Sequence, residues 1–265
     1  MPTATINGIT IAYTEAGQGT PVLFVHGYPL NRTMWEPQLT ALSQRARAIA
    51  VDLRGHGESS APLWFATMDL FADDLKGLLD HLNIEQAVVC GFSMGGYATF
   101  AFYRKYPERV RGLILADTRA QPDSPEAKQN RFNAAQTAHQ QGVKAIADGI
   151  LPRLLTPASI EGNPVLVAKV RAILESVPVA GIAADLMALA ERPDSQPLLP
   201  QISVPTLVIV GAEDTLTPPT DSQLMAERIP RARLVTIPNA AHLSNMEQPE
   251  AFNRAVGEFL RAHSD

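Results

Sequence analysis

The sequence predicts an α/β fold with a mostly parallel, doubly wound sheet, an N-terminal antiparallel hairpin and a helical cap insertion. Three observations predict this fold class. Apolar runs that end in glycine or a polar residue recur along the chain, which is typical of strands buried on both faces of a parallel sheet. Helical patterns separate most of these runs. One long stretch, residues 119–204, contains no strand-like run.

The first expected element is a hairpin. Residues 4–16 read ATINGITIAYTEA, which is two alternating segments on either side of Asn7 and Gly8. Asn-Gly in this setting is the strongest short-range signal for a two-residue hairpin turn. We therefore expect two antiparallel strands at one edge of the sheet.

Six apolar runs follow the hairpin, and each is expected to form a strand buried on both faces of the sheet. In chain order they are residues 20–27, 46–55, 85–93, 110–118, 205–214 and 232–242. Helices are expected between most of them and after the last, at Trp35–Ser43, Met68–Leu82, Gly95–Tyr106, Thr220–Arg228 and Pro249–Ala262. This alternation is what a doubly wound parallel sheet requires.

The insertion is too long to be a simple connection between a strand and a helix. Helical patterns interrupted by proline and glycine fill it, at Pro125–Gln141, Val143–Leu151, Pro164–Ser176 and Val179–Glu191. Ser124 followed by Pro125 is typical of a helix start. We interpret the chain as an α/β core, residues 1–118 and 205–265, with a helical cap or lid, residues 119–204, over the carboxyl edge of the sheet.

Composition excludes several classes of function. The 265 residues carry a net charge of -5, without a cluster of Lys and Arg that would indicate a nucleic-acid or membrane partner. Cys90 is the single cysteine, and its place in an apolar run predicts a buried, unreactive side chain. The N-terminus lacks the pattern of a signal peptide and no apolar run is long enough to span a membrane, so a cytoplasmic location is expected.

Three candidate catalytic residues each follow an expected strand: Ser93, Asp214 and His242. Chemistry in open α/β sheets gathers beyond the carboxyl ends of the strands. The order Ser, Asp, His is that of enzymes with a nucleophile elbow. In such an elbow the serine of G-x-S-x-G stands on a sharp strand-to-helix turn. Gly91 and Gly95 flank the serine, and the lack of a Cβ at both positions relieves clashes in such a turn. We interpret Ser93 as a nucleophile, His242 as its base and Asp214 as the residue that orients the histidine.

Two backbone N–H groups are the candidates for an oxyanion hole, those of Met94 and Tyr28. Met94 begins the helix after the serine. Tyr28 belongs to the loop His26-Gly27-Tyr28-Pro29, where Gly27 permits a tight reversal. His26 is expected to orient this loop through hydrogen bonds, and we hypothesise a cis bond before Pro29.

Asp117 is the alternative acid, because it also follows a strand, whereas Glu213 beside Asp214 is expected to point elsewhere. His56, in the loop of residues 52–59, is expected to have a structural role. Surface positions are expected for His81, His139 and His263. No spacing of His, Cys or carboxylates indicates a metal site and no motif indicates a nucleotide, so neither a metal nor a cofactor is expected.

The motifs HGYPL, DLRGHGES, GFSMGG, GAEDTLTPP and NAAHLSNMEQPEAF together resemble the α/β-hydrolase superfamily across nearly the whole chain. The chain is most similar to the capped esterase and lactonase group that is often labelled 3-oxoadipate enol-lactonase-like. The stretches LADTRAQPDSPEA and ALAERPDSQPLLP, at the two ends of the insertion, also look like that group. GFSMGG after an HG-x-P loop is similar to cofactor-free haloperoxidases as well, which are serine esterases with perhydrolase side activity.

The resemblance implies the α/β-hydrolase fold and a cofactor-independent serine hydrolase that cleaves a small-molecule ester or lactone. Haloalkane dehalogenases and epoxide hydrolases share the HG-x-P loop but carry aspartate at the position of Ser93, which argues against both. Two alternatives stay open, namely acyl transfer to peroxide and a ligand-binding receptor with vestigial hydrolysis. The natural substrate, the preference for ester or lactone, and the oligomeric state, monomer or homodimer, are also left open.

A mostly apolar substrate pocket is expected where the cap covers the site. The candidate lining residues are Tyr28, Phe132, Ile146, Ile150, Leu186, Met187 and Leu243. An enol-lactonase that binds a dicarboxylate-derived lactone also needs a cation near the pocket. Arg131, Arg153 and Arg171 in the cap are the candidates, with simple surface charge as the alternative for each.

Overall fold

The computed structural model of the chain describes residues 2–60 and 66–263. One eight-stranded sheet runs through this part of the chain, in the strand order β1-β2-β4-β3-β5-β6-β7-β8. Its strands are β1 (Thr3–Ile6), β2 (Ile9–Ala16), β3 (Pro21–Val25), β4 (Arg47–Val51), β5 (Ala87–Phe92), β6 (Val110–Ala116), β7 (Thr206–Gly211) and β8 (Ala232–Ile237). From β4 to β8 every neighbouring pair is parallel, whereas β1 with β2 and β2 with β4 are antiparallel. The predicted fold class is confirmed.

The N-terminal hairpin turns at Asn7 and Gly8, as expected. Both residues have positive φ, 50° and 76°, which is the conformation that a two-residue turn of this kind needs. Ile6 pairs with Ile9 across the turn, and both side chains are buried. The hairpin joins the parallel strands through β2, whose residues Tyr13 to Ala16 pair with β4.

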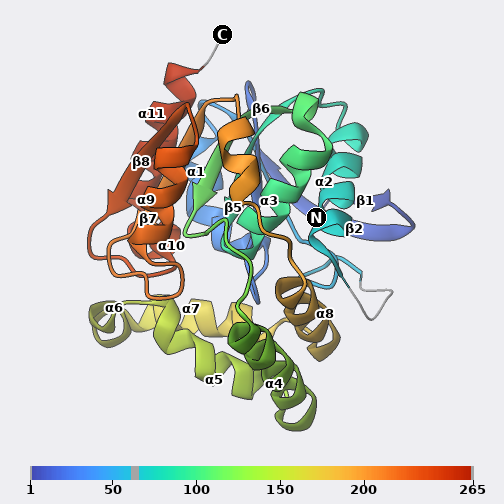
Figure 1. Cartoon of the computed structure of the whole chain (residues 1–265), viewed down its shortest axis with the longest axis vertical. Coiled ribbons are helices and arrows are strands. Elements are labelled where there is room, and N and C mark those ends of the chain that lie inside the picture. The colour runs from blue at the N-terminus through green and yellow to red at the C-terminus, as the bar shows by residue number, and fades with distance from the viewer. Residues whose placement is uncertain (1, 61–65, 264–265) are drawn as a thin grey trace.

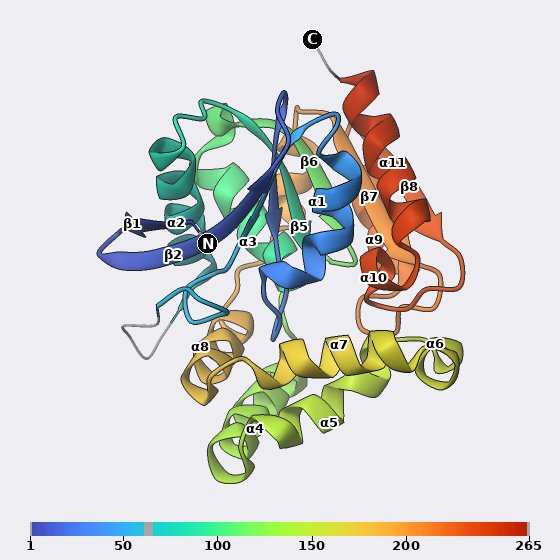
Figure 2. The same cartoon turned by 180° about the vertical axis from the view of Figure 1, so that it is seen from behind.

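Helices cover both faces of the sheet, as a doubly wound sheet requires (Figure 2). On one face lie α2 (Met68–His81), α3 (Met94–Lys105) and α9 (Pro219–Arg228), whose apolar side chains join a single buried cluster. On the other face lie α1 (Glu36–Leu42), α10 (Ser244–Glu247) and α11 (Pro249–Ala262), which share a second buried cluster. Phe71 and Phe252, one from each cluster, are fully buried. Parallel strands between two apolar layers explain the continuous hydrophobic runs of the sequence.

The strand β8 departs from the expectation for its sequence. The run at residues 232–242 was expected to be buried on both faces, yet Ile237 is the only buried residue of the strand. β8 pairs with β7 alone and ends the sheet. A strand at an edge has one neighbour and is covered less completely, so its remaining side chains are half-buried or exposed.

Five helices, called the cap helices below, lie between β6 and β7 in the chain. They are α4 (Pro125–Gln141), α5 (Val143–Leu154), α6 (Pro157–Gly162), α7 (Pro164–Glu175) and α8 (Val179–Ala190). Figures 1 and 2 show them gathered in a layer of their own beside one end of the sheet. Four of them were predicted. The six-residue α6 was not, because so short a helix shows no apolar periodicity, although Thr156 caps it and Pro157 begins it.

Helix α8 packs closely on the loop that follows β4. A Cβ built on Gly181 would lie 2.4 Å from the carbonyl oxygen of Gly55. Beside this contact, His56 Nε2 lies 2.8 Å from Asp185 Oδ2, and both side chains are buried. A structural role was expected for His56, and in the structure its side chain pairs with a carboxylate of a cap helix.

No single helix among the described residues is long and apolar enough to cross a membrane. The helices α7 and α8 reach the required length and hydropathy only when taken together, and they are bent by 88° to one another.

The contact of α8 with the core predicts the effect of Gly181→Ala. The new methyl group would meet a backbone carbonyl, which cannot rotate away, so we expect a loss of about 1–3 kcal/mol in the free energy of unfolding. Chemical denaturation followed by circular dichroism measures the change. Gly149→Ala in α5 is the matched control, because nothing lies within 4 Å of its Cβ position and alanine in a helix interior stabilises by about 0.5–1 kcal/mol. Equal effects of the two substitutions would contradict the packing described here.

Candidate active site

Ser93 stands on the turn between β5 and α3. Its φ of 50° and ψ of -115° lie in a region that residues with a Cβ rarely adopt. The serine N–H donates to the carbonyl oxygen of Ala116 on β6 at 3.0 Å, and the helix begins at the next residue. The surrounding hydrogen bonds and packing thus hold the side chain at the end of the strand.

Two glycines make this turn possible. A Cβ on Gly95 would lie 2.3 Å from the carbonyl oxygen of Val25, and a Cβ on Gly91 would lie 2.4 Å from the carbonyl oxygen of Gly95. Both contacts are with backbone atoms and leave no room for a methyl group. The close approach draws the start of α3 against the end of β3, which brings the loop after β3 next to Ser93.

His242 joins the serine to Asp214. Its Nε2 lies 2.9 Å from Ser93 Oγ, and its Nδ1 lies 2.7 Å from Asp214 Oδ2. An ionised carboxylate only accepts hydrogen bonds, so Nδ1 carries the proton and Nε2 is free to accept from the serine hydroxyl. The imidazole is 3% exposed and packs against the ring of Phe92, 4.9 Å between centroids. The three predicted catalytic residues therefore form one hydrogen-bonded chain.

Asp214 is held in its ionised form. Leu216 N–H and Thr217 N–H donate to its Oδ1 at 2.8 and 3.0 Å, and the Thr217 hydroxyl donates to Oδ2 at 2.7 Å. Burial acts to raise the pKa of this carboxyl, but the charge and hydrogen bond of His242 and the bonds from Thr217 outweigh it and lower the pKa. Its neighbour Glu213 is exposed, as expected.

The alternative acid, Asp117, is buried near Asp214 but has other partners. Gly211 N–H donates to its Oδ1 at 2.8 Å and the Ser244 hydroxyl donates to its Oδ2 at 2.5 Å. Burial and the charge of Asp214 raise the pKa of Asp117 well above its ordinary value. Its contacts tie the ends of β6 and β7 to the segment after His242, which is a structural arrangement.

The loop after β3 lies directly against the serine. A Cβ on Gly27 would be 2.9 Å from Ser93 Cβ, and Leu30 N–H closes the turn by donating to the Gly27 carbonyl at 2.9 Å. The Tyr28–Pro29 bond is cis, as hypothesised. Met94 is the first residue of α3, where backbone N–H groups have no partner within the helix. The two expected oxyanion donors, the N–H groups of Tyr28 and Met94, thus belong to the residue after Gly27, which contacts Ser93, and to the residue after Ser93 itself.

His26 orients this loop through two hydrogen bonds of its imidazole ring. Leu53 N–H donates to its Nε2 at 3.0 Å, so Nδ1 carries the proton and donates to the Gly27 carbonyl at 2.9 Å. Burial lowers the pKa of His26 well below its ordinary value, and the nearby His56 lowers it further. A neutral imidazole that both accepts and donates is what these two bonds require.

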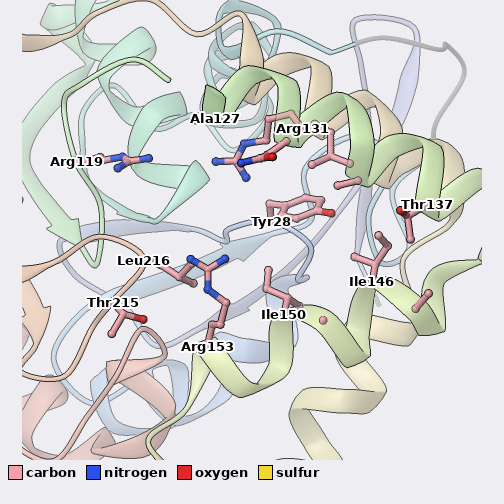
Figure 3. Close-up of a pocket in the computed structure, with 15 residues that line it drawn as sticks. Tyr28, Arg119, Ala127, Arg131, Thr137, Ile146, Ile150, Arg153, Thr215 and Leu216 are labelled. Atoms are coloured by element: carbon pink, nitrogen blue, oxygen red, sulfur yellow. The ribbon is translucent and has the colours of Figure 1, made fainter. Parts of the chain in front are cut away.

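Two adjacent cavities lie between the core and the cap helices. The inner one, of about 60 Å³, is lined by Ser93, His242, Met94, Tyr97, Leu154, Leu189 and Thr217. The outer one, of about 600 Å³, is lined mainly by residues of α4 and α5 (Figure 3). Both cavities are lined by Tyr28, Arg119, Arg131, Ile150 and Leu216, and the boundary that these residues share is called the passage below.

Four of the seven predicted pocket residues line the outer cavity: Tyr28, Ile146, Ile150 and Leu186. The other three line neither cavity, which corrects the prediction for them. Phe132 is 45% exposed on the outer side of α4, one residue along from Arg131 and therefore about 100° around the helix. Met187 is half-buried against the core, and Leu243 is fully buried in the cluster on the far face of the sheet.

The expectation of a mostly apolar pocket is wrong. Figure 3 shows Arg119, Arg131 and Arg153 pointing into the outer cavity from three different segments. Two of these were among the predicted cations, whereas Arg171 lies on the surface with Asp148 and Glu175. Arg119 was missed because it follows β6 in a segment without periodicity, where the sequence alone does not show which side chain turns inward.

The single cysteine and the three histidines predicted at surface positions line neither cavity. Cys90 is buried, and burial followed by the charge of Asp117 raises its thiol pKa well above the ordinary value. Across the described residues, no group of three or more His, Cys, Asp or Glu side chains could hold a metal ion. His81 and His139 are exposed as expected, and His263 is half-buried with its Nδ1 2.8 Å from the Phe259 carbonyl oxygen.

Known proteins resemble this chain in both sequence and fold. The alpha/beta hydrolase family matches residues 22–255. The chain is 38% identical to 3-oxoadipate enol-lactonase 2 of Acinetobacter baylyi, over 98% of this chain and 96% of that protein. Among solved structures, a thermophilic esterase from Thermogutta terrifontis with malate bound has a TM-score of 0.96 at 46% identity, covering 100% and 99% of the two chains. The enol-lactonase from Burkholderia xenovorans LB400 has a TM-score of 0.92 at 34% identity, covering 98% and 100%.

The backbone of Ser93 predicts an unusual order of stability. Glycine adopts positive φ freely, so Ser93→Gly relieves strain that Ser93→Ala retains. We expect Ser93→Gly to be the more stable variant, by about 1 kcal/mol in the free energy of unfolding after the greater flexibility of glycine in the unfolded chain is counted. The same two substitutions at Ser159, inside α6, are the control and should show the opposite order, because alanine favours a helix. An Ser93→Ala variant more stable than Ser93→Gly would contradict the strained turn.

Proposed function

Because the chain belongs to the alpha/beta hydrolase family and is similar to esterases and enol-lactonases, it is a carboxylic ester hydrolase, and we propose that it cleaves esters or lactones through an acyl-enzyme on Ser93. The observation that carries the proposal is the hydrogen-bonded chain from Ser93 Oγ through His242 to Asp214, with its distances of 2.9 and 2.7 Å. A serine, a base and a carboxylate in this order are the parts that nucleophilic acyl transfer needs.

In the first half of the proposed reaction, Ser93 Oγ attacks the ester carbonyl carbon while His242 Nε2 takes the hydroxyl proton. Asp214 keeps the imidazole in the required tautomer and stabilises the imidazolium that forms. The negative charge that develops on the carbonyl oxygen is accepted by the N–H groups of Met94 and Tyr28. The intermediate then expels the alcohol, which receives the proton from His242, and the acyl group remains bonded to Ser93.

In the second half, a water molecule replaces the alcohol. His242 Nε2 removes a proton from this water, whose oxygen attacks the acyl carbon, and the same N–H groups hold the oxyanion again. Release of the carboxylic acid returns the proton to Ser93. With a lactone the leaving hydroxyl stays attached to the acyl group, so a single ring-opened product forms.

The charge of the outer cavity supports a further element of the proposal, a substrate with a carboxylate group away from the reacting carbonyl. Three arginines line this cavity, and no Asp or Glu of the described residues does. Arg153 has no ion-pair partner within the described part of the chain, and the buried Nε of Arg119 has no hydrogen-bond partner there. Guanidinium groups match the geometry of a carboxylate and bind it through paired hydrogen bonds. A carboxylate in the outer cavity would leave the ester group near Ser93.

The proposed roles predict how the catalytic residues respond to substitution. Ser93→Ala should reduce kcat for p-nitrophenyl esters by about 10⁶-fold, because no nucleophile remains, and Asp214→Asn by about 10⁴-fold, because the histidine loses its correct tautomer. Steady-state kinetics with rigorously purified protein measures both losses.

Asp117→Asn is the matched control for the acid. The Asp117 side chain accepts hydrogen bonds from Gly211 N–H and the Ser244 hydroxyl and has none with His242 among the described residues. We therefore expect kcat to stay within about tenfold of the wild type. A greater loss in Asp117→Asn than in Asp214→Asn would exchange the two assignments.

Substrate charge tests the outer cavity. The p-nitrophenyl monoesters of succinate, glutarate and adipate should have higher kcat/KM than the esters of butyrate, valerate and hexanoate, which match them in length and lack the charge. Arg153→Gln should lower kcat/KM for the anionic series by roughly tenfold, as expected for the loss of a charged hydrogen bond, and leave the neutral series within twofold.

Arg171→Gln provides the control, because it removes the same charge from a cap helix at an exposed position that lines neither cavity. Its kcat/KM should be unchanged for both series. Equal losses in the two series with Arg153→Gln would count against a carboxylate site, while the assignment of Ser93 would stand.

A further inference from the structure

A single buried carboxylate, that of Asp123, holds three arginines between the core and the cap helices. Asp123 lies in the segment that leads from β6 to α4, and its side chain is fully buried. Arg131 donates from Nε to Oδ2 at 3.0 Å, Arg192 Nη1 lies 2.7 Å from Oδ1, and Arg119 Nη2 lies 3.5 Å from Oδ1. The three arginines come from α4, from the residues after α8 and from the residues after β6.

The three arginines differ in what else surrounds them. Arg192 is 2% exposed, stacks on the Tyr97 ring at 4.3 Å and donates to the carbonyl oxygens of Gln121 and Leu189. It lines neither cavity. The side chains of Arg119 and Arg131 are about a quarter exposed, and both line the passage between the inner and outer cavities. Asp123 thus holds one guanidinium inside the wall and two at the passage.

The geometry of the Arg131 contact decides which of its donors face a ligand. Its Nε is bonded to Asp123, so the two terminal Nη groups are the donors left for a substrate (Figure 3). Burial acts to raise the pKa of Asp123, but the hydrogen bond from Arg131 and the charges of Arg131 and Arg192 outweigh it and lower the pKa. Asp123 therefore remains a charged acceptor that sets the direction of the Arg131 side chain.

We propose that Asp123 is a positioning residue that determines selectivity for anionic substrates by orienting Arg131 toward the passage. This inference rests on the proposed function, because it concerns the carboxylate-bearing substrates named there. It adds that selectivity depends on how the arginines are held and not only on the positive charge that they bring.

The two accounts predict opposite effects of Asp123→Asn. This substitution removes a negative charge beside the passage, so an account based on net charge predicts stronger binding of anionic esters. The positioning account predicts weaker binding, because Arg131 loses the hydrogen bond that fixes its direction. We expect the ratio of kcat/KM for p-nitrophenyl hydrogen glutarate to that for p-nitrophenyl valerate to fall at least tenfold, mainly through KM of the anionic ester.

Asp221→Asn is the matched control. Asp221 Oδ2 lies 4.0 Å from Arg119 Nη1, and its Oδ1 accepts from Gln121 Nε2 at 3.0 Å, a bond that the amide oxygen of asparagine can keep. The variant therefore loses the same charge near the same arginine. Its ratio should equal or exceed that of the wild type. A ratio for Asp123→Asn at or above the wild-type value, or an equal fall in Asp221→Asn, would overturn the proposal.

Arg131→Lys keeps the test decisive if Asp123→Asn does not fold. Lysine retains the positive charge but has a single ammonium group, which cannot bond Asp123 and present a fork to the substrate at the same time. The ratio should fall as in Asp123→Asn, and a ratio within twofold of the wild type would overturn the proposal. Valerate hydrolysis by the wild type separates the two levels of inference, because its absence would refute the proposed function itself.

Discussion

At φ 50° and ψ -115°, Ser93 occupies a backbone conformation that costs a residue with a side chain about 1–3 kcal/mol, and the surrounding packing holds it there. The hydrogen bond to Ala116 fixes one side of the turn, and the contact of Gly95 with the carbonyl of Val25 fixes the other. The same contact seats the loop of residues 26–29 beside the serine. The positions of the nucleophile and of both proposed oxyanion donors follow from this one crowded crossing of β3, β5 and α3.

Several buried carboxylates form ion pairs in the core and in the cap helices. An ionised group inside a protein is costly unless a counter-charge or hydrogen bonds meet it, and the buried carboxylates fulfil this condition. Asp214 meets His242, Asp185 meets His56, and Asp123 meets Arg131 and Arg192. The pair of Asp185 and His56 joins α8 to the core, and Asp123 ties α4 to the two segments that connect the cap helices to the sheet. The chain carries a net charge of -5, yet one of its cavities is lined by arginines. The carboxylate of Asp123, which pairs with Arg131, does not itself line this cavity.

Much of the fold and part of the site could be predicted from the sequence, for identifiable reasons. Strands buried on both faces produce unmistakable apolar runs, and the chain order of Ser93, Asp214 and His242 is a local pattern that survives without knowledge of packing. The edge position of β8 and the outward direction of Phe132 could not be predicted, since both depend on what lies alongside. The inward turn of Arg119 falls in a segment without periodicity. The meeting of three arginines at Asp123 depends on Arg192, which follows the last cap helix, and no sequence pattern records that contact.

The two segments that connect the cap helices to the core run side by side. Ser195 N–H donates to the Ala120 carbonyl at 2.9 Å, and the Arg192 guanidinium donates to the Gln121 carbonyl. The segment that leads into the cap helices and the segment that leads out of them thus form one short junction. Its hydrogen bonds do not involve the helices between the two segments. Because hydrogen bonds between these two segments close the junction, a change in chain length between residues 124 and 191 need not displace the strands β6 and β7 to which the junction is attached.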